Sequence, residues 1–102
     1  MLESAQEGLI LVDKEGIITM TNQAFASIFN TSPERLIGRP VTEVYVNPKF
    51  PEVLQTGLPV YGHIHDLNGH QIIASGFPSK RDGVVVGAVG KVRIKNLDDL
   101  YS

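Results

Sequence analysis

The three histidines of this chain are the residues whose type and spacing come nearest to a ligating or proton-transferring site. His63, His65 and His70 flank an Asn-Gly turn. On a regular strand His63 and His65 share one face, where two imidazoles could bind a metal ion or titrate together near neutral pH. Asp66 would point to the opposite face, so no third protein ligand is evident. We therefore expect solvent-exposed strand histidines and no metal site.

A catalytic site needs a nucleophile, a base and an orienting group within reach of one another. Ser75, His63 and Asp66 supply these residue types, but no sequence motif groups them. The chain has no cysteine, which excludes disulfides, thiolate metal sites and cysteine nucleophiles. It also has no glycine-rich phosphate-binding loop followed by Lys and Ser or Thr. We expect no catalytic residues, and a chain that is not an enzyme on its own.

The composition is that of one ordinary globular domain. The 102 residues are 42% hydrophobic and 20% charged, with a formal net charge of -2. The basic residues are scattered, so we expect no direct nucleic-acid binding by this domain. No segment approaches the about 20 apolar residues that span a membrane, and the N-terminus lacks a signal-peptide pattern. These features favour a cytoplasmic domain without membrane contact.

The first half of the chain reads as a hairpin followed by short helices. Two strands, at 8–13 and 17–21, are separated by a turn that contains Gly16. Asn22 can cap a helix whose apolar face recurs at helical spacing. Short helices follow from Pro33 to Gly38, within 41–46 and over 51–57, because proline suits a helix start and glycine a helix end.

The second half reads as three strands. They are expected at 60–67, 70–77 and 84–94, with a two-residue turn at Asn68-Gly69 and Pro78 ending the middle strand. In the last strand the even positions are small or apolar and are assigned to the core. The fold class is α+β, a five-stranded antiparallel sheet with short helices packed on one face. We divide the chain into an N-terminal segment at 1–7, a domain at 8–95 and the start of a C-terminal linker helix at 96–102.

This order of elements, with four local motifs, resembles the PAS family of sensory domains. The motifs are GLILVD at 8–13 with GII at 16–18, TNQAF at 21–25, SPERLIGRP at 32–40 and DGVVVGAVG at 82–90. A narrower resemblance, carried by IGRPVTEV at 37–44 and PEVLQTG at 51–57, is to the N-terminal PAS domain of sigma-54-dependent transcriptional regulators. It implies a bacterial sensory input domain whose parent protein binds DNA. The alternatives are the PAS input domain of a histidine kinase and a pure dimerisation module with a filled core.

PAS domains bind small molecules between their helices and the concave face of the sheet. The resemblance maps such a ligand pocket onto Phe25, Ile28, Phe29, Val44, Tyr45, Phe50, Leu54, Ile73, Ser75, Ala88 and Gly90. The same residues could instead fill the core, because a chain this short has little volume to spare. Heme-binding members take their iron ligand from a helical histidine, and light-sensing members form a flavin adduct with cysteine. Neither residue is available here, so no cofactor is certain and neither heme nor a flavin photoadduct is expected.

The last strand also suggests a surface for self-association. If its even positions enter the core, Val85 and Val89 face outward beside charged residues, and Tyr61 extends the patch from a neighbouring strand. We expect a homodimer through this surface. The alternative is that an entry or exit helix of the same chain covers these valines.

Overall fold

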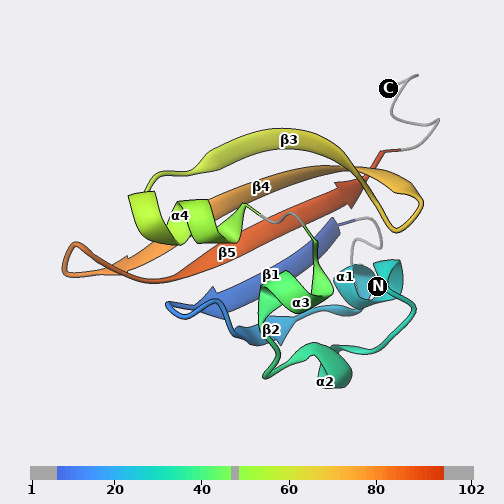
Figure 1. The fold of residues 1–102 in the computed structure, drawn as a ribbon, viewed down its shortest axis with the longest axis horizontal. Helices are drawn as coiled ribbons and strands as arrows, with labels where there is room; N and C mark the ends of the chain where they lie inside the picture. Colours follow the sequence, from blue (N-terminus) through green and yellow to red (C-terminus); the bar gives the residue numbers. More distant parts are fainter. Residues whose placement is uncertain (1–6, 47–48, 96–102) are drawn as a thin grey trace.

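The computed structural model describes residues 7–46 and 49–95, which form one antiparallel sheet with four short helices on one face (Figure 1). The strands are β1 Glu7–Asp13, β2 Ile18–Thr21, β3 Val60–Leu67, β4 His70–Arg81 and β5 Val84–Ile94. The helices are α1 Gln23–Ile28, α2 Pro33–Leu36, α3 Val41–Val44 and α4 Phe50–Thr56. The strand order β2-β1-β5-β4-β3 places β5 in the centre and leaves β2 and β3 as edges. The predicted α+β architecture is confirmed, while the linker helix expected at 96–102, and all but Glu7 of the N-terminal segment, lie outside the described residues.

Asn22 joins the first hairpin to the first helix. Its side-chain oxygen accepts hydrogen bonds from the backbone N–H of Phe25, as the predicted helix cap, and from that of Leu9 in β1, both at 3.0 Å. Its amide nitrogen donates to the Glu7 carbonyl at 3.1 Å. Gly8 allows α1 to lie directly on β1, since a Cβ there would come within 2.9 Å of the Phe25 Cα. The Asn22 side chain thus fixes where the helix layer begins.

Hydrogen bonds from the β1–β2 turn hold the next helices in place. The N–H of Val41, at the start of α3, donates to the Gly16 carbonyl at 2.9 Å, and Gly16 has the positive φ of 82° that the turn requires.

Gly57 ends α4 in the left-handed conformation, as its sequence position predicted. No helix in the described parts of the chain is long and apolar enough to cross a membrane.

The core lies between the sheet and these helices. Phe25, Ile10, Ile18, Val53 and Val92 are among its fully buried side chains, and they come from α1, β1, β2, α4 and β5. Burying a side chain of this kind contributes about 1.5–3 kcal/mol. The hydrophobic effect therefore fixes how the short helices sit, since none is long enough to be stable by itself.

Strand β4 departs from prediction by continuing through Pro78 to Arg81. Pro78 pairs with Ala88 of β5, whereas the pairing of β4 with β3 ends at Gly76. Beyond that residue one side of β4 has no neighbouring strand. A proline is tolerated there because its missing N–H interrupts no ladder.

Candidate functional site

Most of the predicted pocket residues do line the space between the helices and the sheet. Those buried in the core are Phe25, Ile28, Tyr45, Phe50, Ala88 and Gly90, and those packed against it while partly exposed are Phe29, Val44 and Leu54. They come from all three parts of the fold that surround the interior, namely α1, the α3–α4 region and β5. These nine residues therefore lie around the interior onto which the resemblance mapped a pocket.

The two predicted pocket residues of β4 face away from it. Ile72 and Ala74 are buried in the core, so by strand alternation Ile73 and Ser75 present their side chains to the helix-free face. The Ser75 hydroxyl accepts a hydrogen bond from the Gly62 N–H at 3.0 Å instead of facing a ligand. The side chain of Ile73 thus lies on the face opposite the predicted pocket. Ser75, whose side chain also faces away, still borders the small cavity beside Phe50.

The space that a ligand would need is filled by a side chain. The Phe50 ring of α4 lies over Gly90 of β5, and a Cβ at Gly90 would overlap that ring. A partly open cavity of about 20 Å³ lies beside Phe50, Tyr45 and Val60. This volume suffices for about one water molecule and not for an organic ligand. Among the residues that the structure describes, Phe50 therefore packs against the sheet at the place where the resemblance put a ligand.

Aromatic side chains run in an unbroken series through the interior. Phe25 contacts Phe29 with ring centroids 5.2 Å apart, and Tyr45 lies 6.1 Å from Phe25 and 6.4 Å from Phe50. Such spacings are those of attractive, tilted aromatic pairs. Tyr45 follows α3 and is only 2% exposed. It therefore connects the core to the edge strand β3, where the series ends in two histidines.

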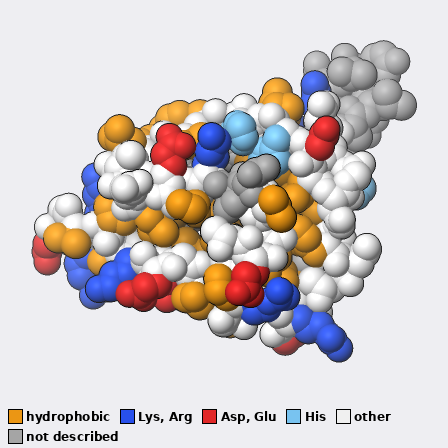
Figure 2. Space-filling view, in the orientation of Figure 1, with side chains coloured by type: hydrophobic (Ala, Val, Ile, Leu, Met, Phe, Trp, Pro, Cys, Tyr) orange, Lys and Arg blue, Asp and Glu red, His pale blue; other side chains and the backbone are white. Residues whose placement is uncertain are grey.

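His63 and His65 face the helices, contrary to the expectation that they are exposed strand residues. They pair with Ala74 and Ile72, whose side chains enter the core. Each histidine is partly buried, and their ring centroids are 4.7 Å apart. His65 Nε2 lies 2.9 Å from the Tyr45 hydroxyl, and the two rings stack at 5.5 Å. Histidine side chains gather beside a basic group on this face of the molecule (Figure 2).

The surroundings of these residues shift two pKa values. Burial raises the pKa of the Tyr45 phenol, so this residue stays protonated. Burial also lowers the pKa of His65, and the nearby His63 and Lys49 lower it further, while Asp66 opposes them. The net effect favours the neutral form of His65.

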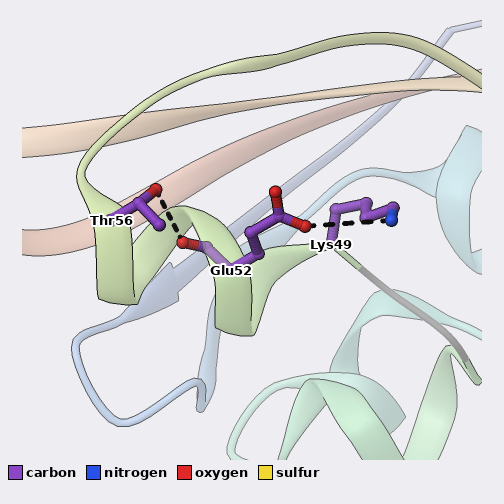
Figure 3. Close-up of polar contacts among 3 residues, drawn as sticks. All are labelled: Lys49, Glu52 and Thr56. Carbon is purple, nitrogen blue, oxygen red and sulfur yellow. Dashed lines mark hydrogen bonds and ion pairs between the residues drawn. The ribbon is translucent and has the colours of Figure 1, made fainter.

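Lys49 is positioned by the first turn of α4 (Figure 3). Its Nζ lies 3.8 Å from Glu52 Oε1, in an exposed pair of little energetic weight. One turn later the Thr56 hydroxyl donates to the Glu52 carbonyl at 2.9 Å. Lys49 precedes α4 on the side of the helix layer near His65, and its charge disfavours protonation of that histidine.

The residues considered for catalysis do not assemble. His63 faces the helices, whereas Ser75 and Asp66 lie at positions of the opposite strand parity. Within residues 7–46 and 49–95, no group of three His, Cys, Asp or Glu residues is placed to hold a metal ion. The histidine cluster has the chemistry of hydrogen bonding and proton binding.

A hollow that the sequence gave no means to predict lies on the outside of the helix layer. Its volume is about 350 Å³, and its walls include Gly16, Pro40, Thr42 and Gln55 as well as Leu54. These residues belong to the β1–β2 turn, the start of α3 and α4, which are far apart in the sequence. Leu54, which was expected inside the pocket, borders this outer hollow.

The helix-free face of the sheet carries one apolar row across all five strands. Met20 pairs with Leu11, Leu11 with Val89, and Val89 with Phe77, while Tyr61 makes an edge contact to Phe77 at 5.5 Å. Met20 is 57% exposed and Tyr61 is 72% exposed. Val89 and Tyr61 thus belong to one surface, which we call the apolar row.

Val85 does not belong to the apolar row, although the sequence placed it there. A bulge follows Ser79, so Lys80 pairs with Val85 and the intervening Val86 is 40% exposed. The Val85 side chain lies against Gly57 at the end of α4. The extra residue reverses the strand parity at this end of β5, and the outward assignment of Val85 was therefore wrong.

Comparisons with known proteins agree with this fold. The family model described as PAS fold matches residues 1–76. The chain is 35% identical over 98 residues to the sensor protein CitS of Halalkalibacterium halodurans, covering 94% of this chain and 18% of that protein. It is 32% identical over 83 residues to a probable C4-dicarboxylate sensor kinase of the same organism, covering 81% of this chain and 15% of that protein. The sensory box histidine kinase of Vibrio cholerae superimposes with a TM-score of 0.72 at 16% identity, over 89% of this chain and 83% of that one.

Proposed function

The chain belongs to the PAS family, and from this premise we propose that it is the sensory input domain of a sensor histidine kinase. The observation that carries the proposal is its 35% identity, over nearly its whole length, to a sensor protein. A second relative at 32% identity is described as a sensor kinase. These relatives favour the histidine-kinase alternative over the regulator of sigma-54-dependent transcription to which local motifs pointed.

The chain spans less than a fifth of the curated relatives that it matches. In the proposed arrangement phosphoryl transfer belongs to other parts of the longer protein, and this domain is not itself catalytic. Its task is to pass a conformational signal to them.

We propose that the signal passes through association of domains and not through an organic ligand held in the core. The filled interior, with room for about one water, supports this part of the proposal. The apolar row offers the corresponding surface, because it presents large hydrophobic side chains on every strand of the sheet. A signal can act only by changing the relative stability of two such arrangements.

The proposal is tested on the full protein that carries this chain. Incubated with labelled ATP, it should phosphorylate itself on histidine, giving a phosphate bond that is labile in acid and stable in base. Substituting Val89 in the apolar row by glutamate should change the extent of labelling, whereas Val84→Glu, an exposed position outside the row, should not. ATP hydrolysis with DNA binding and no phosphohistidine would instead support the sigma-54 regulator.

A further inference from the structure

His65 lies between two aromatic partners on the edge strand of the sheet. On one side its Nε2 is 2.9 Å from the hydroxyl of Tyr45, which follows α3. On the other side its ring centroid is 4.7 Å from that of His63. Its second ring nitrogen, Nδ1, is buried and has no hydrogen-bond partner among the residues that the structure describes. The contact joins β3 to the helix layer through one titratable group.

The hydrogen bond between Tyr45 and His65 is available to a neutral imidazole in either direction. The phenol can donate to Nε2, or a protonated Nε2 can donate to the phenol oxygen, in which case Nδ1 carries no hydrogen. An imidazolium has a hydrogen on both nitrogens. It would place a buried donor at Nδ1 without an acceptor in the described structure, which is costly. The same unpaired donor would exist in the neutral tautomer that accepts at Nε2. The observed packing therefore fits the neutral tautomer whose Nε2 donates to the phenol oxygen, because that form alone has no hydrogen at Nδ1.

The titratable groups around His65 also disfavour its protonation, with the exception of Asp66. On its own strand, His63 disfavours a positive charge and Asp66 favours it, and Lys49 before α4 disfavours it. Tyr45 is a neutral phenol, and β4 presents the apolar Ile72 directly opposite. The net surroundings oppose protonation while the cluster is assembled.

The strand that carries His65, β3, has a neighbouring strand on one side only and can move when the Tyr45 contact is lost. β3 is hydrogen-bonded along its length to β4 alone, since it forms the edge of the sheet. Besides the Tyr45 contact, the end of β3 is tied to the helices where the Asn68 amide donates to the Ile28 carbonyl at 2.6 Å. Loss of the Tyr45 contact would thus loosen the middle of β3 while its turn stays anchored.

We propose that His65 is a proton-sensing site, and that protonation of its imidazole releases the middle of β3 from Tyr45 and the helix layer. The step is a simple proton uptake from solvent at Nδ1, while Nε2 still donates to the phenol oxygen of Tyr45. The new Nδ1–H has no acceptor in the described structure, so it gains one only when the ring leaves Tyr45 and moves into water. This response belongs to the chain itself and does not depend on which output domain follows it.

The test is an NMR titration of the 102-residue chain with labelled histidines, read together with amide hydrogen exchange along β3. His65 should titrate below the ordinary histidine pKa of 6.5, because burial and its neighbours His63 and Lys49 disfavour the cation. Exchange at residues 63–65, corrected for intrinsic rates, should rise about tenfold as His65 protonates. A His65 midpoint at or above pH 6.5, or no change in β3 exchange through the titration, would overturn the proposal.

Three variants separate the proposed switch from general acid sensitivity. His63→Asn should raise the pH at which His65 titrates, because it removes a neighbouring group that disfavours the cation. Tyr45→Phe should give fast β3 exchange at every pH, since the hydrogen bond that holds the His65 ring to the helix layer is already absent. His70→Asn is the matched control and should leave the pH step unchanged. If the rise in β3 exchange persists in a folded His65→Asn variant, His65 is not the proton-sensing site. If His65→Asn does not fold, an unchanged His65 midpoint in His63→Asn would refute the proposal instead.

Discussion

The ring of Phe50 occupies the space above the backbone of Gly90, so the helix layer touches the sheet where a side chain would otherwise stand. Both residues had been assigned to a ligand pocket. Glycine at this position makes room for an aromatic ring of the same chain, and the two together close the interior to about 20 Å³. At this point of the interior, the ring therefore stands where an organic ligand would otherwise lie.

Substitutions at this pair should show strong coupling. Phe50→Ala should destabilise the domain by about 3–5 kcal/mol through loss of buried surface and a new cavity. Gly90→Ala should cost about 1–3 kcal/mol, because the added methyl overlaps the ring. The double variant should be less destabilised than the sum, since removing the ring makes room for the methyl. Denaturant unfolding of the four proteins measures this, and strict additivity would show that the ring does not fill the site.

Two other core substitutions distinguish the inner from the outer side of the helix layer. Phe25 is 0% exposed, and Phe25→Ala should cost about 3–5 kcal/mol. Leu54 is partly exposed at the outer hollow, so Leu54→Ala should cost about 1–2 kcal/mol. Thermal or denaturant melts compare them directly. Equal losses would mean that α4 buries Leu54 more deeply than the structure shows.

Stability should fall on acidification in a manner that depends on His65. Its pKa in the folded chain lies below the ordinary value of 6.5, so the unfolded chain takes up a proton first as the pH falls. The stabilisation is complete above pH 6.5 and is lost as the pH drops through the folded pKa. Melting temperatures recorded from pH 8 downward should show this loss in the wild-type chain. A folded His65→Asn variant should lack this component, and parallel curves for the two proteins would contradict the prediction.

The sequence predicted the elements well because their signals are local. Asn22 as a helix cap and Gly57 as a helix end depend on a few neighbouring residues, and both appear in the structure. Strand facing is less local. The Asn68-Gly69 turn fixes Leu67 opposite His70, and therefore His65 opposite Ile72. The prediction placed the Ile73 side chain in the core, which is consistent only with His65 on the opposite face. The same error about which residues of β4 face inward therefore accompanies the wrong facing of Ile73 and of the histidines.

The bulge in β5 had no comparable signal. Val84, Val85 and Val86 are chemically alike, and no residue among them marks the place where the ladder slips. The sequence therefore could not show that Val85 packs against Gly57 while Val89 stays in the apolar row. The closure of the interior by Phe50 was equally hidden, because it depends on how helix and sheet approach each other in space.

Metal removal should leave the domain unchanged. His63 and His65 face the same side, but within the described residues no third ligand joins them, and Nε2 of His65 already contacts Tyr45. Melting curves with and without EDTA should therefore coincide. Stoichiometric zinc in the purified chain, lost in the His63→Ala, His65→Ala double variant, would show that these residues rearrange into a metal site.

The last prediction concerns self-association through the apolar row. Sedimentation at micromolar concentrations should detect a dimer of the chain, because Met20, Tyr61 and the side chains between them expose hydrophobic surface on every strand. Val89→Glu places a charge in the middle of this row and should shift the equilibrium to monomer. Val84→Glu, at an exposed position of the same strand, is the control and should leave the dimer intact. Val85→Glu is unsuitable, because Val85 lies against Gly57 and its loss would damage the fold. A dimer that survives Val89→Glu would move the interface away from the open face of the sheet.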